Sequence, residues 1–460
     1  MEQERQEFAT GDDNNWVKAR SSLVWIAAIL VAFGSVWWIE RESGKELIAR
    51  RPGAPVQAAP APAVLPASPD LPAALPAPRA LTEQEKQWAR TAWTYFERNT
   101  DPATGLASSV EGFPSTSLWD TASSLLALLA ARDLGLVDQK AFDARMARAL
   151  DALGRLPLYA NALPNKTYDT RTLAMTDYRN QPAPAGIGWS AIDIGRLLVP
   201  LNAIAWQHPQ HTEAARRAIA RWNTAQLARD GQLWGLQAGE GGGPPQPVQE
   251  GRLGYEQYAA RTLALMGLDV DVAADPMAHL QLVDIEGIAV PADRREPATH
   301  GAQNHVVSEP WILQGLEFGW TRQSREIAWR VYRAQEERFR KTGVKTAATE
   351  DHVDQPPYFV YNSLYNGGRR WVAVSEKGEE MPQLRTLSTK AAFGWHALLR
   401  TPYTTQLVDA VAGLNDPARG WYAGRYEAGD KPNQSVNANT NAVVLESLAY
   451  IVRGRLLQYR

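Results

Sequence analysis

The chain has 460 residues, with 48 Lys and Arg against 50 Asp and Glu, so its net charge of -2 is nearly neutral. Because it has no long basic run, a nucleic-acid partner is not expected. It contains no cysteine, which excludes disulfides, thiolate metal sites and cysteine nucleophiles. It also lacks a G-x-S-x-G elbow, a phosphate-cradling loop and a dinucleotide fingerprint, which disfavours serine hydrolases and nucleotide enzymes, and we predict no cofactor.

The first predicted element is an uncharged apolar segment over residues 23–39. With Ser21 and Ser22 it is just long enough to cross the hydrocarbon core of a bilayer, and tryptophans lie near both of its ends. We predict an uncleaved transmembrane anchor over residues 21–40. A cleaved signal peptide, whose apolar region would be shorter, is the alternative.

The orientation of this anchor is not decided by charge, because basic residues flank it on both sides. A large domain following a linker suits an exported protein. We therefore predict residues 1–20 as a cytoplasmic tail and the C-terminal domain as periplasmic, held at the inner (cytoplasmic) membrane by a single pass. Residues 52–79 are almost entirely Pro, Ala and small apolar residues, so we predict an extended spacer within a linker over 41–80.

A single globular domain is predicted from residue 81 to residue 460. It opens with a capping box at Thr82 and Glu85. Six nearly all-apolar helical runs follow, and each begins with a small polar or aromatic cluster. The clusters lie at 117–120, 188–193, 254–258, 307–311, 387–390 and 437–441. Such apolar helices must be buried on most sides.

Amphipathic helices, predicted at 139–153, 212–228 and 324–341, tend to alternate with the apolar runs. The pattern predicts an all-α (α/α)6 toroid, in which six inner helices place their polar N-terminal clusters at one end. Strand signals are limited to short pieces. One predicted β-hairpin joins 358–361 to 370–374 across Asn366-Gly367-Gly368.

Four carboxylates lie at or near the start of an inner helix and beside an aromatic residue. They are Asp120, Asp193, Glu256 and Glu309. Each has a structural alternative as a cap or first-turn residue facing the helix dipole. Glu is a weaker cap than Asp or Ser, so we predict that Glu256 and Glu309 supply the general acid and the base or nucleophile, with Asp120 as a third candidate. Asp193 has an alternative role as the partner of Arg196, three residues further along its helix.

Other residues of the clusters are candidates for binding sugar. Aromatic side chains can stack on sugar rings, although core packing is the alternative for each of them; these are Trp119, Trp189, Tyr255, Tyr258 and Trp311. Polar groups suited to binding hydroxyls, besides Asp193, are Glu350, Asp351, Lys390, Asn437 and Asn439. No metal site is predicted, because the His and acidic residues have no recognisable ligand spacing.

Four motifs carry a resemblance to a known family. They are GIGWSAIDIGRLL at 186–198, YEQYAARTLALMG at 255–267, SEPWILQGLEFG at 308–319 and ATEDHVDQPPYFVYNSLYNGGRRW at 348–371. With these motifs the chain resembles DUF3131, a bacterial family of unknown function, and more distantly the glucoamylase-like (α/α)6 proteins that act on β-glucans. The resemblance covers about residues 81–460. It implies an all-α toroid and action on a bacterial polysaccharide, but it supplies no catalytic pair.

The predicted function is that of a membrane-anchored periplasmic glycoside hydrolase, or a related transglycosylase or lyase. Its substrate would be an exopolysaccharide or a periplasmic glucan, cleaved by carboxylate acid and base chemistry. The alternative is a non-catalytic glycan-binding or scaffold subunit of a polysaccharide synthesis and export system, partnered by a membrane polysaccharide synthase. An enzyme needs two carboxylates within catalytic distance in an open cleft, whereas a binding protein does not. A transferase is a weaker third class, because no nucleotide or lipid-phosphate site is evident.

Overall fold

The computed structural model of the protein describes residues 59–60, 65–239, 241, 243–296, 300 and 304–457. These residues all belong to one compact unit, Val56–Arg460. The predicted tail and anchor, residues 1–20 and 21–40, lie outside the described residues and stay predictions. Within the described ranges, no helix combines the length and the apolar character needed to span a bilayer.

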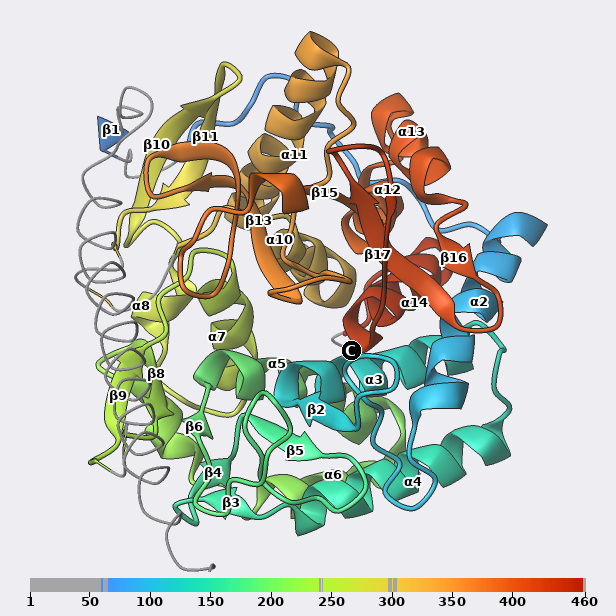
Figure 1. The fold of residues 1–460 in the computed structure, drawn as a ribbon, viewed down its shortest axis with the longest axis vertical. Coiled ribbons are helices and arrows are strands. Elements are labelled where there is room, and N and C mark those ends of the chain that lie inside the picture. The colour runs from blue at the N-terminus through green and yellow to red at the C-terminus, as the bar shows by residue number, and fades with distance from the viewer. Residues whose placement is uncertain are drawn as a thin grey trace, which may run out of the picture. The chain divides into compact units, whose positions relative to one another are not determined.

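Six helical segments form a closed inner ring (Figure 1). They are α3 (Leu118–Asp133), α5 (Ala191–Gln207), α7 (Tyr255–Leu265), α10 (Glu309–Leu313) continued by the π-helical turn η4 (Gln314–Phe318), α12 (Thr389–Leu399) and α14 (Ala438–Arg453). Each segment contacts the next, and α14 contacts α3. The six apolar runs of the sequence are these six segments, so the predicted barrel is confirmed.

Five further helices lie at the periphery of the ring (Figure 1). They are α2 (Glu83–Asn99), α4 (Gln139–Arg155), α6 (Thr212–Ile219), α11 (Arg322–Thr342) and α13 (Pro402–Val411). Between α7 and α10 the described chain has only the one-turn helix α8 (Asp271–Ala274) and the hairpin of β10 (Leu280–Ile285) and β11 (Ile288–Asp293), which packs on α11. The sequence analysis missed this hairpin. The sequence signal for this hairpin is the glycine of the Glu286-Gly287 turn, where both residues have positive φ.

Short antiparallel strands introduce four of the inner helices. These strands are β2 (Ser115–Ser117), β6 (Gly188–Trp189), β15 (Thr386–Ser388) and β18 (Pro432–Val436). Their partners are β5 (Thr167–Asp169), β8 (Gln232–Gln237) and β17 (Gly420–Tyr426). The remaining short strands in these sheets and beside them are β3 (Leu158–Tyr159), β4 (Leu163–Pro164), β7 (Ala228–Arg229), β9 (Gln246–Gln249) and β16 (Asn415–Asp416). The pairing fixes where the inner helices begin.

Gly188 shows how tightly one of these junctions is built. Its φ is 116°, and a Cβ at this position would lie 1.8 Å from the carbonyl oxygen of Leu236 on the paired strand. Only glycine therefore fits at the entrance to α5.

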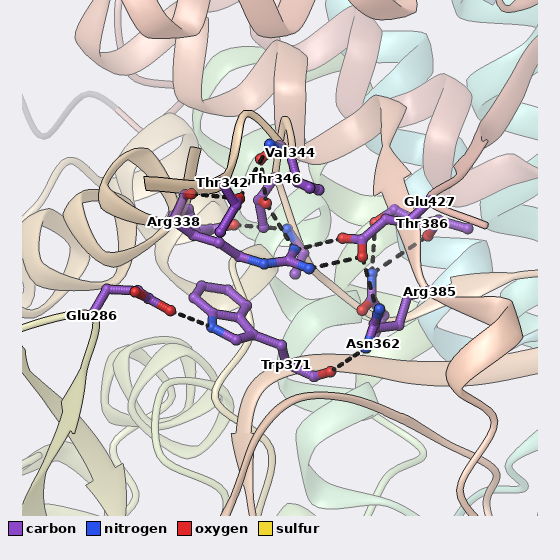
Figure 2. A network of polar contacts seen from close by, with 12 residues as sticks. Glu286, Arg338, Thr342, Val344, Thr346, Asn362, Trp371, Arg385, Thr386 and Glu427 are labelled. Atoms are coloured by element: carbon purple, nitrogen blue, oxygen red, sulfur yellow. Dashed lines mark hydrogen bonds and ion pairs between the residues drawn. The ribbon is translucent and has the colours of Figure 1, made fainter. Parts of the chain in front are cut away.

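The predicted hairpin is confirmed as β13 (Phe359–Asn366) and β14 (Arg369–Val374), with β12 (Asp351–His352) added beside β13. Figure 2 shows how the base of this sheet is tied to the barrel. Arg338 of α11 donates to both carboxylate oxygens of Glu427 at 2.6 and 2.8 Å, and its guanidinium lies 4.7 Å from the ring centre of Trp371 in β14. Arg385 donates to the same carboxylate at 3.0 Å and to the Trp371 carbonyl at 3.2 Å. The sheet is thus held in place over the inner ring.

The last part of the predicted spacer packs on the barrel. Ser68 donates to Glu326, and Asp70 accepts from Trp329 at 3.0 Å. Extended Pro-rich backbone has free carbonyls, and those of Pro66 and Ala77 accept from Arg330 and Arg400 at 2.8 and 2.7 Å. The short strand β1 (Ala59–Pro60) also pairs with β10. From residue 65 onward this segment therefore lies along the outer wall and is not a free tether.

Candidate active site

The N-terminal ends of the inner helices meet across the ring. Asn439 of α14 donates to Glu309 of α10 at 2.8 Å, and the rings of Trp119 in α3 and Tyr255 in α7 lie 5.3 Å apart, edge to face. These contacts join helices from different sides of the barrel. The sequence clusters therefore come together at one end of the barrel, and this end is the candidate active site.

A buried ion network forms the floor of this end. Arg196 has no exposed surface and donates to Glu317 at 3.0 Å and to the Tyr258 hydroxyl at 2.9 Å. Its guanidinium lies 3.8 Å from Glu446 and 4.5 Å from the ring centre of Trp119. The alternative pairing of Arg196 with Asp193 is wrong, because Arg196 points into the barrel toward these groups. Tyr258 donates to Glu317 at 2.6 Å, so this predicted sugar-binding residue is part of the floor.

Asp193 lies one turn before Arg196 in α5, at the end of the barrel where the N-termini of the inner helices meet. We call this end the mouth. Ser190 caps α5 by accepting from the Asp193 backbone N–H at 3.1 Å. Glu250, in the segment between β9 and α7, accepts from the Ile192 N–H at 2.8 Å and from the Ser190 hydroxyl at 3.0 Å. Asp193 and Glu250 are both half-buried. Burial raises the pKa of Asp193 to about 7, and the negative charge of Glu250 adds to the effect.

Glu250 was missed by the sequence analysis, because nothing in its flanking residues distinguishes it from an ordinary loop carboxylate. One indirect signal is Gly235 in β8, where a Cβ would lie 2.3 Å from the Glu250 carboxylate. The missing side chain of Gly235 thus makes room for Glu250 at the start of α5.

A second group of charges lies on the side of α10, α12 and β12. Glu309 is 2 % exposed; Asn439 donates to one of its oxygens and the Lys390 ammonium pairs with the other. Lys390 also lies 3.6 Å from Asp351. Burial raises the pKa of Asp351 to about 8, although the charge of Lys390 acts in the opposite direction. Four predicted site residues, Glu309, Asp351, Lys390 and Asn439, therefore lie together.

Glu350 belongs to the same neighbourhood. Thr349 donates to its carboxylate at 2.8 Å. Burial raises the pKa of Glu350, and the positive charge of Lys390 opposes that rise. Asn437, by contrast, caps α14 by accepting from the Thr440 N–H at 2.8 Å, a structural role that the sequence analysis did not predict for it.

Asp120 occupies in α3 the position that Asp193 has in α5, three residues after the capping serine. The Ser117 hydroxyl accepts from the Asp120 N–H at 3.0 Å and donates to the Asp120 carboxylate at 2.7 Å. Asp120 is 6 % exposed, and no Lys or Arg of the described chain forms an ion pair with it. Burial lowers the pKa of the half-buried His352, and the opposing effect of the Asp120 charge indicates that the two residues are close.

Glu256 points elsewhere. Its carboxylate accepts from Arg295 at 2.6 Å and from Gln249 at 3.1 Å, and Arg295 also pairs with Asp293 of β11 at 2.6 Å. Both members of the Glu256–Arg295 pair are buried. This pair ties α7 to the β10–β11 hairpin, so we leave Glu256 out of the site proposed below.

Glu256→Gln tests this placement. We expect it to lower the free energy of unfolding by about 1–3 kcal/mol, because Arg295 keeps only one ionised partner in a buried position. The exposed pair of Glu83 and Lys86 supplies the control: Glu83→Gln should change stability by less than about 1 kcal/mol. Urea unfolding measures both variants. Full stability together with a large loss of glycan cleavage would instead support the catalytic role predicted from sequence.

The predicted stacking aromatics differ in accessibility. Trp119 is half-buried, whereas Trp189, Tyr255 and Trp311 are buried. Trp189 packs edge to face on Tyr159, at 5.7 Å between ring centres. Of the predicted platforms, Trp119 is the one placed to meet a ligand at the mouth without rearrangement.

Comparisons with known proteins agree with this fold. Residues 87–454 match the family described as protein of unknown function (DUF3131), and the chain belongs to that family. No curated protein gives a significant match. Among solved structures, an endo-β-1,2-glucanase from Chitinophaga pinensis, bound to sophorotriose and glucose, superposes with a TM-score of 0.59 at 12 % identity, covering 82 % of this chain and 94 % of its own.

Two further structures are similar. A glucoamylase-like protein from Bacteroides caccae has a TM-score of 0.58 at 14 % identity, covering 81 % of this chain and 94 % of its own. An endo-β-1,2-glucanase from Talaromyces funiculosus, bound to sophorose, has a TM-score of 0.55 at 11 % identity, covering 81 % and 84 %. At these identities the likeness establishes a shared barrel fold.

Within the described residues, no group of His and acidic side chains is arranged to hold a metal ion.

Proposed function

We propose that this protein is a glycoside hydrolase acting on a β-linked glucan, and that Asp193 is its general acid. The observation that carries the proposal is the half-buried Asp193 at the mouth, whose pKa of about 7 keeps a proton available near neutral pH. Hydrolysis of a glycosidic bond needs such a proton for the leaving oxygen. Burial raises the pKa of Glu250 as well, whereas its two accepted hydrogen bonds act in the opposite direction; in this proposal the proton resides on Asp193.

The second carboxylate of the proposed reaction is Asp120. It starts the inner helix next to α5, at the position equivalent to Asp193. Packed helices lie about 8–10 Å apart. Equivalent carboxylates on two neighbouring helices therefore fall near the separation of about 6.5–9.5 Å that inverting hydrolases use to hold a water.

Asp120 is preferred to Glu309 as the base. Lys390 and Asn439 already occupy both oxygens of Glu309, whereas Asp120 is bound by the neutral Ser117 hydroxyl. In this proposal, the buried group of Glu309, Lys390 and Asp351 supports the wall beside the reaction centre, and Trp119 contacts the ring of the sugar.

The finer features of the proposal concern substrate and location. Two of the similar structures are endo-β-1,2-glucanases, which makes a β-1,2-glucan the first substrate to try. The apolar run at 23–39 supports anchoring of the domain at the periplasmic face of the inner membrane. Protease treatment of intact cells and of spheroplasts tests that location: the domain should be digested only in spheroplasts.

The experiment for the function is incubation of the full-length protein with a panel of bacterial polysaccharides that includes linear β-1,2-glucan. Shortened products, detected by mass spectrometry, support the proposal. Tight binding of one polysaccharide without cleavage would support the alternative, a glycan-binding or scaffold subunit of a synthesis and export system.

The pH dependence of cleavage follows from Asp193. Because the acid must be protonated, kcat/KM should fall as pH rises through about 7. Glu250→Gln removes a negative charge beside Asp193, so it should move this alkaline limb to lower pH. The groups that act on Asp193 besides Glu250 are Lys166, Arg252 and Ser190. An alkaline limb that stays in place in Glu250→Gln would show that another group supplies the proton.

A further inference from the structure

Residues 176–182, in the segment between β5 and β6, form a rigid turn. Asp177 accepts from the backbone N–H groups of Arg179 and Gln181 at 2.9 and 2.8 Å, and Asn180 takes the left-handed conformation with a φ of 57°. The Asn180 side chain donates to Asp169 at 3.2 Å, which ties the turn to β5. The turn is therefore fixed by its own hydrogen bonds and by the strand beneath it.

The turn is tied to the strands that lead into α3 and α5. It belongs to the segment between β5 and β6; β5 pairs with β2, which leads into α3, and β6 leads into α5. Figure 1 shows these three strands grouped beside the two helices. Asp120 and Asp193 lie in the first turns of the same helices, so the turn is held near the proposed reaction centre.

Tyr178 is at the tip of this turn, and its side chain is 60 % exposed. Desolvation by the neighbouring chain raises its pKa, and the negative charges of Asp193 and Glu250 raise it further. Tyr361 and Glu376, from the β13–β14 hairpin and the turn after it, act on it as well. Tyr178 is therefore accessible to a ligand and lies within electrostatic range of Asp193, which belongs to the proposed reaction centre.

An exposed aromatic ring on a rigid support, beside carboxylates, suits one face of a sugar. A pyranose has an apolar C–H face that packs on an aromatic ring, and hydroxyls around its edge that carboxylates bind. We propose that Tyr178 is a substrate-positioning residue that stacks on a sugar ring near Asp193, so that the substrate is a glycan chain extending beyond the scissile bond. This inference rests on the proposed function, because it places the sugar relative to the proposed acid.

Kinetics of the full-length protein test the inference. With linear β-1,2-glucan as the probe, Tyr178→Ala should raise KM about tenfold and leave kcat within about a factor of three, because a stacking contact contributes to binding in this range. Tyr178→Phe keeps the ring and should retain the wild-type KM. Tyr358, which is 61 % exposed on another loop, supplies the control, and Tyr358→Ala should leave KM unchanged.

Binding separates a failure of this inference from a failure of the proposed function. In the Asp193→Asn background, Tyr178→Ala should weaken binding of the same glucan about tenfold, whether or not the wild type cleaves it. Cleavage that is equally efficient in Tyr178→Ala, Tyr358→Ala and wild type would overturn the inference and leave the hydrolase proposal standing. If the glucan is bound but not cleaved and Tyr178→Ala weakens binding, the sugar site holds and the hydrolase proposal fails. If the protein neither binds nor cleaves any glucan, both are overturned.

Discussion

Asp193→Asn and Asp120→Asn are each expected to lower kcat/KM for glucan cleavage by about 10²–10⁴. Asparagine keeps the size and the hydrogen-bonding geometry of the side chain but cannot donate or accept the proton that moves in the reaction. Glu309→Gln is the comparison: it should lower kcat/KM much less, because Glu309 already pairs with Lys390 and Asn439 and does not transfer the proton in this proposal. If Glu309→Gln removes catalysis while Asp120→Asn retains it, the base is Glu309.

Stability supplies the control for Asp193→Asn. The folded-state pKa of Asp193, about 7, lies above its ordinary value of about 3.9, so the folded protein binds more protons than the unfolded chain between those two values. The free energy of unfolding therefore decreases as pH rises through that window. Asparagine removes this dependence. The variant should be at least as stable as the wild type at pH 8, so a loss of activity there cannot be ascribed to unfolding.

Arg196→Met is expected to destabilise the protein by about 3–5 kcal/mol, the largest effect of any single substitution discussed. Arg196 is fully buried and is the cation shared by Glu317 and Glu446. Its removal leaves two carboxylates in the centre of the barrel without a positive charge. Because burial without a cation is most unfavourable for ionised carboxylates, the decrease in the free energy of unfolding should grow as pH rises. Urea unfolding at several pH values measures it.

An exposed arginine with the same kind of aromatic contact gives the control. Arg229 lies 3.9 Å from the ring centre of Trp234, compared with 4.5 Å between Arg196 and Trp119. Arg229→Met should cost less than about 1 kcal/mol, because only the surface contact is lost. Adding Glu317→Gln to Arg196→Met should recover part of the stability by removing one unpaired charge. Equal effects of the two arginine substitutions would show that the buried network does not stabilise the barrel.

The architecture was predictable because burial on all sides leaves a mark in the sequence. The apolar runs that became α3, α5 and α14 carry almost no charge, and inner helices of a closed ring must look like this. The β10–β11 hairpin was not predictable in the same way. It replaces an outer helix through contacts with α11, and such tertiary pairing leaves little local signal.

The candidate site was predictable only to the level of its location. The clusters do meet at one end, but the sequence does not indicate which carboxylate forms an ion pair with a Lys or Arg side chain. Glu256 lies beside Tyr255 at a helix start, as Asp193 lies near Trp189, yet Arg295, 39 residues later, binds Glu256. Glu250 and Tyr178 were missed because each lies in a loop, outside the polar clusters that mark the starts of the inner helices.

The most direct test of the central claim is cleavage of linear β-1,2-glucan in oxygen-18-labelled water, followed by mass spectrometry of the products. A hydrolase that uses Asp193 as acid and Asp120 as base adds one water oxygen at every bond it breaks. The expected result is shortened glucans with one labelled oxygen at each new reducing end for the wild type, and almost no product for Asp193→Asn. Products without the label, as a lyase or transglycosylase would make, or equal yields from wild type and Asp193→Asn, would contradict the account.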